Sequence, residues 1–183
     1  MNYLLLALLG ATALSACSRD AAEFPAPNAL MHNDFESAAG WVADATSLST
    51  EQAHSGKVSL KVDPTHPYSL TYYSLLGQLS EGHIRGVRVE AWAYAPSHAA
   101  SANVRLSIGL NDAPGGQLML GDGIPFSTAV TEDGKWVKVS KDFIFPPKAN
   151  YSSQLVMYLW NGGGTGNGAG PAYLDDIQLT AIE

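Results

Sequence analysis

The chain has 183 residues, of which 46% are hydrophobic and 15% charged, and its formal net charge is −7. This length and apolar content suit one folded domain with a sizeable core behind a short leader. The ten basic residues are scattered along the sequence, whereas nucleic-acid-binding proteins gather them in a stripe or patch, so nucleic acid is excluded as a partner.

Residues 1–16 have the pattern of a secretion leader. The apolar run from Tyr3 to Leu14 is too short to span a bilayer comfortably. It ends in Leu-Ser-Ala-Cys, which resembles a bacterial lipobox, and Cys17 is the only cysteine in the protein. The resemblance implies a lipidated Cys17 in the bacterial cell envelope, and Ser18 after it favours the outer membrane. No Lys or Arg precedes the apolar run, and an ordinary secretory leader with a coincidental cysteine is the alternative.

A tether follows the leader. Residues 17–28 are rich in alanine and proline, which is typical of a linker. We therefore expect the folded domain over residues 29–183, as a monomer. Because the chain has a single cysteine, this domain has no internal disulfide.

From residue 29 onward the sequence predicts β-strands and no helix. Short alternating runs are separated by Gly, Pro, Asn and Asp, and no window keeps a 3.6-residue apolar period. This pattern is typical of an antiparallel β-sandwich, and we expect a jelly roll with its first and last strands side by side. The expected strands cover residues 30–33, 41–42, 45–49, 57–62, 68–75, 87–94, 103–111, 117–120, 126–130, 136–145, 153–160 and 173–182.

The last predicted strand carries an aspartate on an apolar parity. Strict alternation puts Asp175 on the same side as Tyr173 and Ile177, toward the apolar side of the sheet. A bare buried carboxylate costs about several kcal/mol or more, so Asp175 needs a partner. Backbone amides, a basic side chain and a bound cation are the possible partners.

Four motifs in this order resemble carbohydrate-binding modules of the CenC-like group, families 4, 9, 16 and 22. They are Asn33-Asp34-Phe35-Glu36 ahead of Trp41, and the runs 53–62, 134–140 and 173–179. The resemblance covers nearly all of residues 29–183 and implies a galactose-binding-like jelly roll. Such motifs indicate the fold more specifically than they indicate a sugar site.

The resemblance also implies a structural calcium ion. In the family its ligands come from the acidic residue of the opening turn, from carbonyls around a Ser-Gly-Lys turn and from the aspartate of the last strand. These correspond here to Glu36, the backbone of Ser55 and Lys57, and Asp175. Calcium prefers about six to eight oxygen ligands and tolerates irregular geometry. The alternative is that Asp175 accepts hydrogen bonds from backbone amides without a metal.

An aromatic sheet face is the candidate sugar site, because sugars stack on aromatic rings while polar side chains bind their hydroxyls. In the strands at 87–94, 103–111 and 153–160, core-type residues occupy one parity and mainly aromatic or polar residues the other. We expect the second set to line one concave face: Trp92, Tyr94, Tyr158, Trp160, Arg88, Glu90, Arg105 and Gln154. The alternative is that the tryptophans pack against neighbouring side chains, as Trp41 and Trp136 do at their family positions.

Other chemistries lack their motifs. The glycine-rich segment 162–170 has neither a GxGxxG pattern nor a Gly-Lys-Ser/Thr ending, and no HExxH or GxSxG is present. The sequence therefore predicts a non-catalytic, lipid-anchored protein that binds a poly- or oligosaccharide. Two alternatives stay open: a structural or adhesive β-sandwich that binds a protein, and a small polysaccharide lyase or hydrolase, since acidic residues for a catalytic pair are present.

Overall fold

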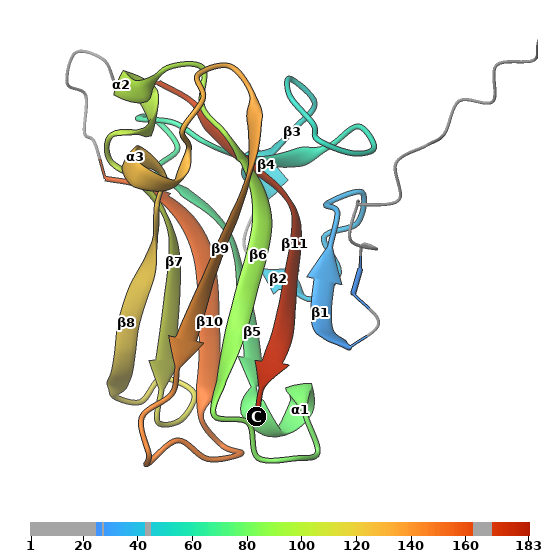
Figure 1. Cartoon of the computed structure of the whole chain (residues 1–183), viewed down its shortest axis with the longest axis vertical. Helices are drawn as coiled ribbons and strands as arrows, with labels where there is room; N and C mark the ends of the chain where they lie inside the picture. Colours follow the sequence, from blue (N-terminus) through green and yellow to red (C-terminus); the bar gives the residue numbers. More distant parts are fainter. Residues whose placement is uncertain (1–24, 27, 43–44, 163–169) are drawn as a thin grey trace, which may run out of the picture.

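Two antiparallel β-sheets pack face to face in the computed structural model of this chain (Figure 1). The structure describes residues 25–26, 28–42, 45–162 and 170–183. The predicted leader, Cys17, most of the tether and most of the glycine-rich segment lie outside the described residues. The predicted class, an antiparallel β-sandwich of the jelly-roll type, is confirmed.

Sheet A has the strand order β3-β4-β11-β6-β9, and β1 also pairs with β11. Strand β4 pairs with the first residues of β11, and β1 pairs farther along, on the side of β11 opposite β6 (Figure 1). The expectation that the first and last strands lie side by side is confirmed. The strands of sheet A are β1 (Ala29–Asn33), β3 (Leu48–Ser49), β4 (Ser59–Val62), β6 (Gly86–Tyr94), β9 (Trp136–Ile144) and β11 (Ala172–Ile182).

Sheet B has the order β2-β5-β10-β7-β8, and every pairing in it is antiparallel. Its strands are β2 (Trp41–Val42), β5 (Tyr68–Leu75), β7 (Val104–Asn111), β8 (Leu118–Pro125) and β10 (Gln154–Asn161).

Short helical turns connect some of the strands, where the sequence predicted none. They are η1 (Ala45–Ser47), α1 (Leu76–Leu79), α2 (His98–Ser101) and α3 (Phe126–Ala129). The expected strand at 126–130 is wrong: β8 continues through the Gly-Asp-Gly-Ile-Pro run, and the buried Phe126 then begins α3. Gly121 and Gly123 do not interrupt β8 because each pairs in register with β7. No helix among the described residues has the length and apolarity to cross a membrane.

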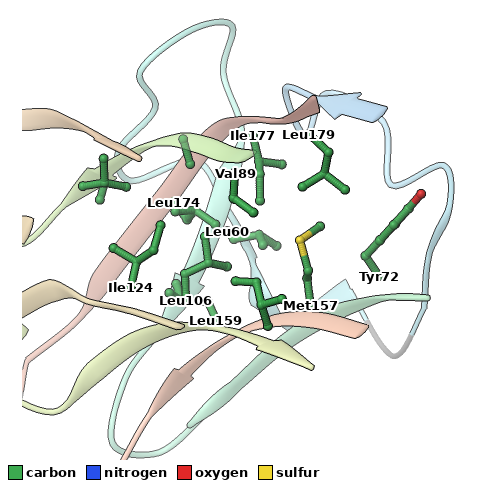
Figure 2. Packing of buried hydrophobic residues seen from close by; sticks show 14 of the residues in the cluster. Leu60, Tyr72, Val89, Leu106, Ile124, Met157, Leu159, Leu174, Ile177 and Leu179 are labelled. Carbon is green, nitrogen blue, oxygen red and sulfur yellow. The ribbon is translucent and has the colours of Figure 1, made fainter. Parts of the chain in front are cut away.

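The core lies between the sheets and follows the predicted alternation. Sheet B contributes Leu106, Met157 and Leu159, and sheet A contributes Leu60 and Leu174, each less than 2% exposed (Figure 2). Full burial of such a side chain stabilises the fold by about 1.5–3 kcal/mol. This alternation also sends the intervening side chains of β6, β7 and β10 to the two outer faces.

A bulge in β11 reverses the expected direction of Asp175. The register with β6 shifts between Asp175 and Gln178, and Asp176 takes a left-handed φ of 47°. The extra residue lets Leu174 and Ile177 both enter the core, whereas Asp175 turns outward beneath the loop that contains His54. The expectation that Asp175 points toward the core is therefore wrong, because strict alternation does not hold across a bulge.

Candidate functional site

The outer face of sheet B brings together half of the predicted sugar-binding residues. On β10 the buried side chains Leu155, Met157 and Leu159 alternate with half-buried outward ones. Those outward residues include Gln154, Tyr158 and Trp160, and Arg105 follows the same rule on the neighbouring strand β7. These four predicted residues share one face.

Three aromatic rings form a continuous surface on this face. Tyr68 of β5 pairs with Trp160 of β10, and their rings lie 6.4 Å apart at 27°. The Tyr68 ring also lies 6.0 Å from that of Tyr158, and 61% of Tyr68 is exposed. The Trp160 ring lies over the backbone of Gly162, where a Cβ would come within 2.6 Å of it. The rings thus present an apolar surface of the kind on which sugars stack.

A groove of about 390 Å³ lies beside these rings, over β7, β8 and β10. Gly109 and Gly121, which are direct cross-strand partners, form part of its floor, and the Leu118 side chain lies over both of them. Polar and apolar groups surround this floor. The groove is lined by Arg105, Ser107, Ile108, Gly109, Asn111, Leu118, Gly121, Asp122, Val156 and Tyr158.

The guanidinium of Arg105 lies over Gly123. A Cβ at Gly123 would come within 2.9 Å of the Arg105 Nε atom, so a larger residue there would displace the arginine. Arg105 is half-buried and pairs across the sheet with Trp160 on one side and Pro125 on the other. The groove therefore combines stacking surface, hydroxyl and amide groups, and one cation.

The other four predicted residues lie on the opposite side of the molecule. They belong to β6, a strand of sheet A, so their side chains lie on the outer face of sheet A and not on that of sheet B: Arg88, Glu90, Trp92 and Tyr94. The expectation that all eight residues line one concave face is wrong. A sandwich has two outer faces, and the parity of a strand does not say to which sheet the strand belongs.

Trp92 packs against the chain's own loop. The His54 ring stacks on it with centroids 3.9 Å apart and an interplanar angle of 13°. The ring centroid of Trp136 lies 5.8 Å from that of His54 and 5.5 Å from that of Tyr94, so Trp136 packs in the same cluster. Trp41 packs in the core with 6% exposure, as expected. The alternative that Trp92 serves packing thus has a specific partner, His54.

The two predicted charged residues of β6 are paired within sheet A. Arg88 donates to both carboxylate oxygens of Asp142, at 2.6 and 2.9 Å. Glu90 lies 3.0 Å from the Lys138 ammonium and accepts a hydrogen bond of 2.8 Å from Gln178. These partners already occupy the groups that a sugar would need.

The predicted calcium ligands converge on the turn at residues 54–58. Glu36 Oε1 accepts hydrogen bonds from the amides of Lys57 and Val58, at 2.6 and 2.7 Å. Asp175 Oδ2 accepts from the amides of His54 and Ser55, at 2.8 and 3.2 Å. Burial raises the pKa of Asp175 to about 6, although these amide bonds oppose the rise.

The neighbouring Asp176 adds side-chain contacts to the same turn. Its carboxylate accepts a hydrogen bond of 2.7 Å from the Ser55 hydroxyl and contacts His54 Nδ1. Two aspartates and Glu36 therefore fasten a single turn over sheet A. Gly56 in that turn has a φ of 55° and lies directly against the Glu36 carboxylate, which leaves no room for a Cβ.

The carboxylates of Glu36 and Asp175 are ligands of the type that calcium prefers, but in this structure both accept hydrogen bonds from backbone amides. Carboxylates beside a turn are the oxygen-rich ligands that calcium prefers. In this arrangement amide hydrogens face the oxygens of Glu36 and Asp175, and a cation would need the carbonyls of Ser55 and Lys57 there instead. Among the described residues, no group of three or more His, Cys, Asp or Glu is placed to hold a metal.

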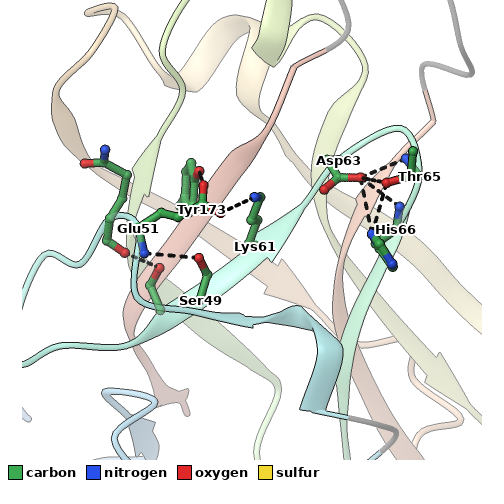
Figure 3. A network of polar contacts seen from close by, with 9 residues as sticks. Ser49, Glu51, Lys61, Asp63, Thr65, His66 and Tyr173 are labelled. Atoms are coloured by element: carbon green, nitrogen blue, oxygen red, sulfur yellow. Dashed lines mark hydrogen bonds and ion pairs between the residues drawn. The ribbon is translucent and has the colours of Figure 1, made fainter.

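Further polar contacts lie along β4 and the residues that flank it, at residues 51–66 (Figure 3). Glu51 accepts hydrogen bonds from the Tyr173 hydroxyl and the Lys61 ammonium, at 2.7 and 2.6 Å. Asp63 accepts from the amides of Thr65 and His66, both at 2.8 Å. Glu51 is thus tied to β4 and β11, whereas the contacts of Asp63 stay within its own turn.

The sequence reasoning missed Tyr68, Ser107, Asn111 and the glycine floor. Tyr68 begins β5, and a register shift between Tyr158 and Trp160 places it, and not Ser69, opposite the tryptophan. The signal for the floor was present in the sequence as Gly109 and Gly121. It becomes readable only when β7 and β8 are known to pair.

Comparisons with known proteins bear on the family and the fold of this chain. A family model described as carbohydrate binding domain matches residues 27–168. No curated protein sequence matches the chain. The CBM22-2 xylan-binding domain of Paenibacillus barcinonensis Xyn10C is 21% identical, with a TM-score of 0.54 over 84% of this chain and 100% of that domain.

Two further solved structures show the same fold. The C-terminal family 22 carbohydrate-binding module of Clostridium thermocellum Xyn10B is 16% identical, with a TM-score of 0.55 over 85% of this chain and 94% of that one. A structure named family 16 carbohydrate binding module-2 is 12% identical, with a TM-score of 0.51 over 78% and 92%. Since the family model spans most of the chain, the protein belongs to this family of carbohydrate-binding domains, which confirms the resemblance found in its motifs.

Proposed function

We propose that this protein is a non-catalytic module that binds a poly- or oligosaccharide on the outer face of sheet B. The observation that carries the proposal is the groove with a glycine floor beside the rings of Tyr68, Tyr158 and Trp160. The rings offer stacking surface, and the glycines contribute no side chains of their own, so that Leu118 lies over that part of the floor. Side chains that can bind hydroxyls stand beside them: Gln154, Ser107 and Asn111.

The neighbouring structures support an extended polysaccharide as the ligand. The family 22 domain of Paenibacillus barcinonensis is named as xylan-binding, and it shares this fold over most of both chains. A groove open to solvent, rather than an enclosed pocket, suits a segment within a long chain. We propose that the ligand crosses β10, β7 and β8, with its sugars stacked on the rings at the β10 side.

The location proposed for this activity is the bacterial cell envelope, with Cys17 lipidated and anchored in the outer membrane. The support is the Leu-Ser-Ala-Cys sequence and the absence of any other cysteine. Mass spectrometry of the amino-terminal peptide from the membrane fraction tests it. Cys17→Ser should move the protein to the soluble fraction of the envelope, and an unmodified Cys17 in membrane-derived protein would contradict the anchor.

A structural calcium ion at Glu36 and Asp175 completes the proposal. It is supported by the convergence of both carboxylates on the turn at residues 54–58. When bound, the ion would replace amide hydrogen bonds with metal–oxygen bonds and would tie the opening turn to the last strand. The ion's role would be structural, because these residues lie over sheet A and the groove lies on sheet B.

A glycan array tests the binding proposal. The probe is the chain from Ser18 onward, which contains every strand of both sheets, together with its Trp160→Ala variant. We expect the unsubstituted chain to bind at least one plant, algal or microbial polysaccharide and the variant to lose most of that binding. Tyr151→Ala is the matched control, because Tyr151 is 53% exposed but lies outside this face.

Each alternative function predicts a different outcome. No binding to any glycan would overturn the proposal and favour a protein partner. Release of new reducing ends or unsaturated products from a bound polysaccharide would show a hydrolase or a lyase.

A further inference from the structure

Arg105 is the only basic residue in the five strands of sheet B. Among the other basic residues that the structure describes, five are in ion pairs: Lys61, Arg88, Lys135, Lys138 and Lys141. The remaining three, Lys57, Arg85 and Lys148, are exposed on loops. Arg105 differs from all of these because it is half-buried, lines a groove and has no ion pair among the described residues.

The nearby carboxylate of Asp122 is already paired elsewhere. Its oxygens lie 2.8 and 2.9 Å from the ammonium of Lys141, which comes from β9 of the other sheet. This ammonium is the main cause that holds the pKa of Asp122 below its ordinary value, and Arg105 contributes least. The guanidinium therefore keeps its N–H groups available to a ligand in the groove.

The surroundings of Arg105 favour a planar anion. The guanidinium lies over Gly123, and the groove beside it contains the Ser107 hydroxyl and the Tyr158 ring. A guanidinium fork matches a carboxylate with two parallel hydrogen bonds, which are stronger than bonds between neutral groups. Arg105 is half-buried and forms no ion pair with Asp122, the carboxylate that also lines the groove, so an anionic ligand that pairs with Arg105 gains more here than a neutral one.

We infer that the glycan bound on sheet B carries carboxylate groups, and that Arg105 pairs with one of them. This inference rests on the proposed function and narrows its ligand to polysaccharides that contain uronic acids. The whole chain has a net charge of −7, which repels polyanions at long range. Selection of an acidic glycan must therefore come from the local pairing at Arg105 and not from a general electrostatic attraction.

Matched pairs of polysaccharides test the inference. Polygalacturonate, alginate and glucuronoxylan are each compared with their carboxyl-reduced forms, in which CH2OH replaces the carboxylate. Calorimetric titration of the chain from Ser18 onward should show binding to at least one acidic polysaccharide. The affinity for its carboxyl-reduced form should be lower by a factor of about ten or more. Arg105→Gln should remove this difference, and Arg105→Lys should restore only part of it. Arg85→Gln removes an exposed guanidinium that does not line the groove and is the matched control.

The outcomes separate this inference from the proposed function. Equal affinity of the unsubstituted chain for an acidic polysaccharide and its reduced form, or binding of neutral glycans alone, would overturn the inference and leave glycan binding intact. No binding to any neutral or acidic glycan would overturn both. The comparison between acidic and reduced ligands needs no variant, so it decides the matter even if Arg105→Gln lowers the unfolding midpoint.

Discussion

The outer faces of the two sheets have the same sequence pattern and different surroundings. Each presents a strand on which core residues alternate with aromatic and polar ones, β6 in sheet A and β10 in sheet B. Over sheet A the loop with His54 covers Trp92, and the charged residues of β6 have partners. Over sheet B, Tyr68 is 61% and Leu118 is 65% exposed beside an open groove. An outward aromatic residue becomes a binding surface only where the rest of the chain leaves it open.

Substitution of one tryptophan on each face should affect a different property: glycan affinity on sheet B and stability on sheet A. Trp160→Ala removes a ring from the open face, so we expect about a tenfold to hundredfold loss of glycan affinity with little change in stability. Trp92→Ala removes the partner of His54, so we expect a loss of about 1–3 kcal/mol in the free energy of unfolding with affinity unchanged. Titration calorimetry and denaturant unfolding measure the two quantities.

This pair of variants also has a clear contrary result. If Trp92→Ala abolished binding while Trp160→Ala did not, the site would lie on sheet A and the assignment to sheet B would be wrong. Tyr68→Ala gives independent support, because its ring neighbours Trp160 and Tyr158 and is largely exposed. It should weaken binding as Trp160→Ala does.

Calcium removal should act on sheet A alone. If calcium binds the folded state at about a hundred times its dissociation constant, it stabilises the fold by about 2.7 kcal/mol. EDTA should therefore lower the unfolding midpoint by roughly 5–10 °C. Glycan affinity measured well below that midpoint should not change, since Glu36 and Asp175 lie away from the groove. An unchanged midpoint in both EDTA and added calcium would contradict the ion.

Asp175→Asn provides the matched variant for the calcium experiment. It keeps the size of the side chain but removes a charged ligand, so its midpoint should respond to neither EDTA nor calcium. A midpoint that still rose with calcium would place the ion elsewhere in the protein.

A filled groove should weaken binding without unfolding the protein. A Cβ at Gly109 would meet Leu118 at an ordinary contact distance of 3.4 Å, and valine suits a strand better than glycine. Gly109→Val should therefore lower glycan affinity about tenfold while the free energy of unfolding stays equal or rises. Gly123→Ala is the contrasting variant, because its Cβ would collide with the Leu106 carbonyl and Arg105, and it should lose stability as well. Unchanged affinity in Gly109→Val would show that sugars do not approach this floor.

The sequence predicted the sandwich and most of its strands because alternation reports which side chains enter the core. For this reason strands were correctly predicted at residues 57–62, 87–94 and 153–160, where the structure has β4, β6 and β10. Alternation is a local signal, and it failed where the chain departs from it. The bulge at Asp176 changed the direction of Asp175, and the glycines of β8 looked like an interruption although they pair with β7.

The binding face was only half predictable for a related reason. Parity separates inward from outward side chains on one strand, but it does not say which strands lie together. Trp92 and Trp160 have the same outward pattern and belong to different sheets, and this depends on long-range pairings of β6 with β11 and of β10 with β5. Covering of Trp92 by His54 likewise joins residues that are far apart in the sequence. Arg105 was predicted as an outward residue and the structure places it on sheet B, but its lack of an ion pair became visible only with Asp122 and Lys141 in place.

The smallest expected effect concerns the edge at which the two sheets meet. Asp122 of β8 in sheet B and Lys141 of β9 in sheet A form an ion pair, with side chains 40% and 38% exposed. At this exposure Asp122→Asn should cost less than about 1 kcal/mol in the free energy of unfolding at pH 7. Lys141 lowers the pKa of Asp122 below its ordinary value, so the stabilisation is present above the ordinary aspartate pKa and is lost as the pH falls through the lowered pKa. The difference between Asp122→Asn and the unsubstituted chain in denaturant unfolding should therefore shrink as the pH falls from 7 through the lowered pKa. A difference that stayed constant over this range would mean that Asp122 acts through packing and not through its charge.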